Sequence, residues 1–225
     1  MFKINIFIAS SIVEFKNERE QFILTMGRLH DYLYENRICN LVIHRCEDFE
    51  INILKQNEGT QDRLNEMIKS SDITLFFFGN KIGDVSKQEL EIAFDNYKKT
   101  NKSLPFVFFI DKEYDNDLPL KYMSELKSKN IDYILIEEFK ELIFSSILFI
   151  NDFYKLNLPL FIFKNKLWIE EEFIMDDILS INKFKDINED KINKILFKDL
   201  DFNINELFID KMYDVYMKLK EVYYD

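Results

Sequence analysis

Glycine, cysteine and proline are scarce in this chain of 225 residues, which has four glycines, two cysteines and three prolines. None of the glycines falls in a G-x-G-x-x-G or G-x-x-x-x-G-K arrangement, so the chain has neither a Rossmann dinucleotide loop nor a P-loop. The two cysteines, Cys39 and Cys46, exclude a disulfide scaffold and fit a reducing compartment. They show no zinc-ligand spacing with the two histidines, so we expect no metal site.

An excess of basic residues and a long apolar run are also missing. There are 30 Lys and Arg residues against 41 Asp and Glu, which gives a net charge of −11 and argues against nucleic-acid binding. The apolar stretch from Leu142 to Ile150 contains two serines and is too short to span a membrane. The apolar run within residues 1–8 is too short for a signal peptide. We therefore expect a cytoplasmic protein without nucleic-acid or membrane partners.

The chain does contain an apolar fraction of 47% and 23 phenylalanines, enough for a folded core. Short β-branched or aromatic runs alternate with longer helical patterns. The predicted strands are Lys3–Ala9, Leu41–Arg45, Ile73–Phe78, Phe106–Ile110 and Tyr133–Ile136, and the predicted helices lie near 12–36, 60–70, 87–100, 119–128 and 138–155. This alternation of strands and helices predicts an α/β fold, a flavodoxin-like five-stranded parallel sheet with helices on both faces. Five βα units are too few for a TIM barrel.

The pattern changes near residue 155, which predicts a first domain over 1–155 and an extension over 156–225. Leu160–Phe163 and Leu167–Glu170 form a predicted β-hairpin. Helices follow near 188–199 and 204–224. The last helix reaches the end of the sequence without a stop signal, so either the natural protein continues or this helix frays.

Ligands of an open α/β sheet bind at the carboxyl ends of its strands, which directs attention to the loops there. Gly79 to Ser86 form the loop after the most apolar strand, and Glu89 comes next on the adjoining helix. Glu89 could be a site carboxylate, or it could simply close a capping box with Ser86. Glu91 points about 200° away around the helix and is the weaker candidate.

Four segments in order resemble the bacterial TIR-like family. They are Ile6–Ser11 followed by Glu18–Glu20, then Ser71–Gly79, then Ser86–Phe94, and the resemblance covers residues 3–155. It implies that Glu89 is the catalytic residue of an NAD+ glycohydrolase, with NAD+ as substrate and no cofactor. The products would be nicotinamide and ADP-ribose or a cyclic form. Nicotinamide is a cationic leaving group, so one carboxylate that stabilises an oxocarbenium-like transition state suffices.

The resemblance and the loop positions together give candidate substrate-binding residues: Ser10, Ser11, Glu47, Asp48, Glu58, Gly79 and Lys81. Ser10 and Ser11 could instead be helix N-caps, and Lys81 could be a solvated lysine. In the family, the loop that corresponds to Cys46–Gly59 packs against a neighbouring copy. The resemblance therefore implies activation by self-association through this loop.

The segment after residue 158 resembles the region C-terminal to the TIR-like domain in bacterial proteins that continue into tetratricopeptide repeats. This implies a C-terminal sensor region and a role as an effector of defence against phage. Two other interpretations stay open. Nucleoside deoxyribosyltransferases look similar around a helix-borne glutamate, in which case Glu89 would be a nucleophile. A catalytically silent TIR-like module would only mediate assembly.

Overall fold

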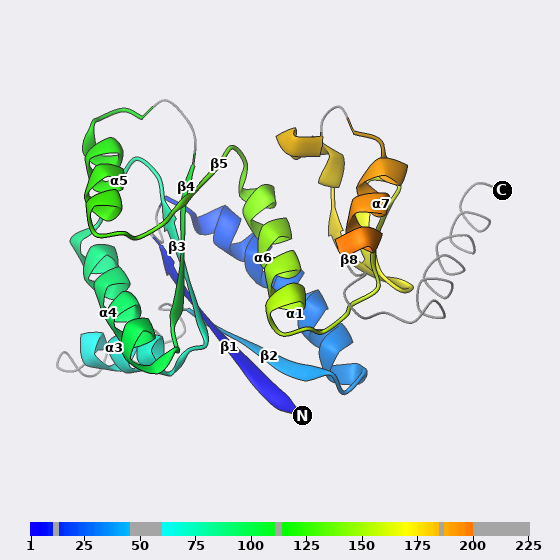
Figure 1. Cartoon of the computed structure of the whole chain (residues 1–225), viewed down its shortest axis with the longest axis horizontal. Coiled ribbons are helices and arrows are strands. Elements are labelled where there is room, and N and C mark those ends of the chain that lie inside the picture. The colour runs from blue at the N-terminus through cyan, green and yellow to red at the C-terminus, as the bar shows by residue number, and fades with distance from the viewer. Residues whose placement is uncertain (11–13, 46–59, 111–113, 185–186, 200–225) are drawn as a thin grey trace. The chain divides into compact units, whose positions relative to one another are not determined.

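The computed structural model describes residues 1–10, 14–45, 60–110, 114–184 and 187–199 (Figure 1). By internal contacts the chain divides into two compact units, residues 1–24 with 33–139 and residues 25–32 with 140–225. The predicted domain boundary near residue 155 marks the place where the sequence pattern changes, and it stays a prediction. It lies between α6 (Phe139–Phe153) and β6 (Leu160–Phe163).

The first unit contains a five-stranded, all-parallel sheet. Its strands are β1 (Phe2–Ser10), β2 (Cys39–Arg45), β3 (Ile73–Phe78), β4 (Leu104–Ile110) and β5 (Ile134–Ile136). They are ordered β2-β1-β3-β4-β5, which is the flavodoxin-like order, so the predicted fold class is confirmed. Every residue of β3 is buried, as its nearly unbroken apolar run predicted for a strand covered on both faces.

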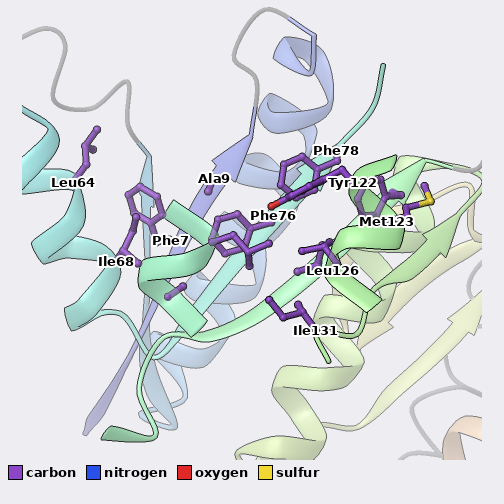
Figure 2. Close-up of a cluster of buried hydrophobic side chains, with 14 residues drawn as sticks. Phe7, Ala9, Leu64, Ile68, Phe76, Phe78, Tyr122, Met123, Leu126 and Ile131 are labelled. Carbon is purple, nitrogen blue, oxygen red and sulfur yellow. The ribbon is translucent and has the colours of Figure 1, made fainter. Parts of the chain in front are cut away.

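Helices cover both faces of this sheet. They are α1 (Lys16–Glu35), α3 (Thr60–Ser70), α4 (Asp84–Thr100) and α5 (Leu118–Ser128). Phe76 and Phe78 belong to a buried cluster with side chains of α3, α4 and α5, which lie along the same side of the sheet (Figures 1 and 2). Phe77 points the other way and packs against Phe22 of α1, with ring centroids 6.2 Å apart. The alternation of the strand thus divides its phenylalanines between two cores.

The second unit is built around a three-stranded antiparallel sheet, β6-β7-β8, with β7 at Lys166–Ile169 and β8 at Glu172–Asp176. The predicted hairpin is confirmed, but β8 was not predicted. In the sequence, Glu170 and Glu171 look like part of a solvent-exposed acidic surface. In the structure they form the turn that leads into β8. Two short 3₁₀ helices, Ile178–Ser180 and Asn182–Phe184, and then α7 (Glu189–Asp199) come after it. The predicted helix over 204–224 lies outside the described residues.

Helix α7 completes the hydrogen bonding of strand β6 through one side chain. The amide of Asn193 is 3% exposed, its Oδ1 accepts from the N–H of Ile162 at 2.6 Å, and its Nδ2 donates to the carbonyl of Ile162 at 2.7 Å. These are the two bonds that a further strand would have provided. The side chain therefore satisfies backbone groups that are buried beneath α7.

Replacing Asn193 with Ala is expected to lower the free energy of unfolding by about 2 kcal/mol, because a buried N–H and carbonyl lose their partners. Lys194→Ala, at the exposed neighbouring position, is the control and should change the free energy by less than about 0.5 kcal/mol. Urea unfolding of both variants checks this. Equal losses in the two would contradict a special role for the amide.

Among the described residues, no helix combines the length and the apolar character needed to cross a bilayer.

Candidate active site

The candidate site lies where the connections of the sheet change direction. From β1 the chain passes through α1 to β2 on one side, and from β2 it returns through α3 to β3 on the other side. The segments after β1 and after β3 therefore diverge at the carboxyl edge. In flavodoxin-like sheets this switch point is where ligands bind. Ser10 ends β1 and lies opposite Phe77 in the register with β3, while Gly79 comes directly after β3.

Glu89 is a buried carboxylate on α4, with 5% of its surface exposed. The alternative that it caps the helix is wrong. Helix α4 begins at Asp84, three residues before the prediction, and its N-cap is Gly83 without a side-chain hydrogen bond. Ser86 therefore already lies within the first turn and Glu89 in the second. The S-x-x-E pattern was a spacing inside the helix and not its start.

The surroundings of Glu89 set its ionisation. Burial raises the pKa of Glu89 to about 7, while a side-chain hydrogen bond from Gln61 and the positive charge of Arg19 act in the opposite direction. Gln61 lies in the first turn of α3, which packs beside α4, and its Nε2 also donates to Asn65 Oδ1 at 3.1 Å. Glu89 can therefore exchange a proton near neutral pH, as a group in acid–base catalysis must.

Arg19 connects this carboxylate to the end of β1. Its side chain is 2% exposed, and its Nη1 donates to Ser10 Oγ at 2.6 Å and to the Ser10 carbonyl at 3.2 Å. Because α1 begins only at Lys16, Ser10 is not the N-cap of that helix. The predicted binding residue Ser10 is thus the acceptor that holds a buried cation at the switch point. Ser11 lies outside the described residues.

The loop after β3 contacts the segment after β1 through Glu14. The carboxylate of Glu14 accepts from the backbone N–H of Asn80 at 2.7 Å and from that of Lys81 at 3.2 Å. Gly79 is required by this approach, because a Cβ there would lie 2.2 Å from Glu14 Oε1 and 2.9 Å from the ring of Phe15. The side chain of Lys81 is exposed.

The structure brings together only some of the predicted residues. Arg19 lowers the pKa of Glu89 by its charge and donates a hydrogen bond to Ser10, while Gly79 and Lys81 lie at Glu14. The others, Glu47, Asp48 and Glu58, fall with the Cys46–Gly59 loop outside the described residues. Within the part of the chain that is described, no group of three or more His, Cys, Asp or Glu side chains could hold a metal ion.

The sequence interpretation overlooked three residues of the site, Arg19, Gln61 and Glu14. A signal for Arg19 was present, because it lies three residues before Phe22 and seven before Met26 on the apolar stripe of α1, where a charge must be buried with a partner. Gln61 and Glu14 carry no comparable signal. Their roles depend on which segments the fold brings next to them.

No family model matches the chain, and no curated protein matches it. Among solved structures, that of the CMP N-glycosidase of Clostridium botulinum is similar over 64% of this chain and 98% of that chain, at 16% sequence identity and a TM-score of 0.40. A similarity of that degree establishes neither a shared site nor a shared reaction.

Proposed function

We propose that the chain is a TIR-like glycohydrolase that cleaves the nicotinamide–ribose bond of NAD+ and leaves ADP-ribose or a cyclic form. The observation that supports this is the carboxylate of Glu89. It is buried on α4, takes no part in capping, and has a pKa near neutrality beside the switch point of a flavodoxin-like sheet. A single carboxylate with these properties meets the modest demand of expelling a cationic leaving group.

In the proposed reaction the bond between ribose C1′ and the nicotinamide nitrogen breaks, and its electron pair neutralises the pyridinium. Positive charge develops on the ribose, and ionised Glu89 stabilises it. Water then adds at C1′ and loses a proton, which a carboxylate with a pKa of about 7 can accept. Arg19 and Gln61 favour the ionised form that the first step requires.

The proposal includes a biological setting that comes from the family resemblance. Copies assemble through the Cys46–Gly59 loop, a C-terminal sensor region triggers assembly, and depletion of NAD+ defends the cell against phage. Activity should therefore depend on protein concentration.

Release of nicotinamide from NAD+ at high protein concentration, with a crowding agent, tests the function. Nicotinamide that accumulates in proportion to time and enzyme supports it. Consumption of a deoxynucleoside with a deoxyribosyl adduct on Glu89, seen by mass spectrometry, would favour the transferase instead. Self-association without consumption of NAD+ would favour the silent assembly module.

The pH dependence follows from the ionised form of Glu89 being the active one. Because burial raises its pKa to about 7, kcat/KM for NAD+ should rise about tenfold per pH unit below that value and level off above it. Initial rates of nicotinamide release across this range measure the profile. The thermal midpoint at each pH is the control for folding. A rate that falls as the pH rises through neutrality would show that protonated Glu89 is the active form.

A further inference from the structure

We propose that the backbone N–H groups of Asn80 and Lys81 form the binding site for a phosphate group of the substrate, and that Glu14 occupies this site in the resting protein. This inference rests on the proposed function, since it assigns a place to the pyrophosphate of a dinucleotide. It adds a competition between substrate and an internal carboxylate.

The contact of Glu14 with Asn80 and Lys81 has the geometry of a bound anion. Two successive N–H groups point at the two oxygens of one carboxylate, with the donor of Asn80 at 2.7 Å from Oε1 and the donor of Lys81 at 3.2 Å from Oε2. Successive backbone donors of this kind bind carboxylates and phosphates alike, because both present a pair of oxygens that share negative charge. The bound carboxylate of Glu14 thus shows that these two N–H groups can bind an anion.

The donors are held from a side that Glu14 does not touch. Asn80 Nδ2 donates to Asp115 Oδ2 at 2.9 Å, Asn80 Oδ1 accepts from the N–H of Asp115 at 3.3 Å, and the carbonyl of Asn80 accepts from Asn116 Nδ2 at 3.3 Å. The segment after β4 therefore fixes the orientation of the loop. When Glu14 leaves, the two N–H groups remain in place for another anion.

The surroundings favour an anion at these donors. The absence of a side chain at Gly79 lets an oxygen approach this close to the backbone, because a Cβ would lie 2.2 Å from Glu14 Oε1. Helix α4 begins at Asp84, three residues after Lys81, and no side chain makes a capping hydrogen bond at its N-cap, Gly83. Lys81 carries an exposed ammonium at the same loop. A phosphate and the carboxylate of Glu14 repel each other, so only one of them occupies the donors.

The test compares wild type with Glu14→Ala and Glu14→Gln by calorimetric titration with ADP, and with adenosine as the matched ligand without phosphate. Glu14→Ala empties the site, so its affinity for ADP should rise at least tenfold while its affinity for adenosine changes less than twofold. Glu14→Gln removes the charge but keeps the size of the side chain. It should give a smaller rise for ADP alone, and it decides the matter if the alanine variant does not fold.

Unchanged or weaker binding of ADP by a folded Glu14 variant would overturn the proposal, as would an equal gain for adenosine. Either result would mean that Glu14 only links the segment after β1 to the loop after β3. The outcome is separable from that of the proposed function, because the titration needs no turnover. A gain for ADP without release of nicotinamide from NAD+ keeps the phosphate site and removes the glycohydrolase. Release of nicotinamide without a gain in ADP affinity keeps the glycohydrolase and removes the phosphate site.

Discussion

Glu89→Gln is expected to lower the release of nicotinamide from NAD+ by about 10² to 10³-fold, because an amide cannot stabilise positive charge on the ribose. The substitution keeps the size of the side chain and its ability to accept a hydrogen bond from Gln61. The buried surroundings of Glu89 therefore stay filled, and the change isolates the charge. The loss should appear in kcat and in kcat/KM together, since the charge develops only in the transition state.

Glu91→Gln is the matched control for this experiment. Glu91 lies two residues along the same helix, is exposed, and forms an ion pair with Lys129 at 2.7 Å. A surface pair of this kind contributes little, so the variant should keep nearly all of the activity. Quantifying nicotinamide by chromatography for the three proteins gives the answer. Equal release of nicotinamide by Glu89→Gln and wild type would show that Glu89 is not the catalytic residue, and equal losses in both variants would point to a general effect on the helix.

The same substitution is expected to stabilise the protein at alkaline pH. The pKa of Glu89 is raised from 4.5 to about 7 in the folded state, so the folded chain holds this proton more tightly than the unfolded chain. The resulting stability is fully present below about pH 4.5 and is lost as the pH rises through about 7. The difference in pKa corresponds to about 3 kcal/mol. Glutamine carries no such dependence.

Glu89→Gln should therefore have a free energy of unfolding up to about 3 kcal/mol above that of wild type near pH 9, and close to it near pH 4. Urea unfolding at several pH values measures the difference, and Glu91→Gln should match the wild-type curve throughout. A difference that is constant with pH would mean that packing and not ionisation distinguishes the variant. Stability gained with a loss of activity is the outcome that a functional buried carboxylate predicts.

The parallel sheet was predictable because its signals are local. The nearly continuous apolar run at Ile73–Phe78 lies between Asp72 and Gly79, and the observed β3 has the same limits. Helix α3 likewise begins and ends where its pattern predicted, at Thr60 and Ser70. In each case the hydrophobic period of the element agrees with the burial that the fold imposes.

The site was only partly predictable, because its decisive contacts join distant segments. The sequence predicted Glu89 as the candidate carboxylate, yet its partner Gln61 lies on another helix, and Arg19 acts from α1 across the end of β1. The start of α4 was misplaced because Ser86 supplied a stronger local capping pattern than Gly83 does. Strand β8 was not predicted, because it is short and the acidic residues at its ends indicated exposed surface. Local patterns specify elements, but tertiary packing decides which side chains meet.

Helix α1 belongs to both compact units, because its residues 25–32 group with 140–225 while its two ends group with the sheet. Arg28 donates to the carbonyl of Ile174 at 3.1 Å and lies over the ring of Phe173, and Tyr32 is hydrogen-bonded to Glu170. A chain cut after the parallel sheet would strip these partners from the middle of the helix whose first turn carries Arg19. If Glu89 is the catalytic residue as proposed, we expect an active fragment to need the C-terminal segment as well as the parallel sheet.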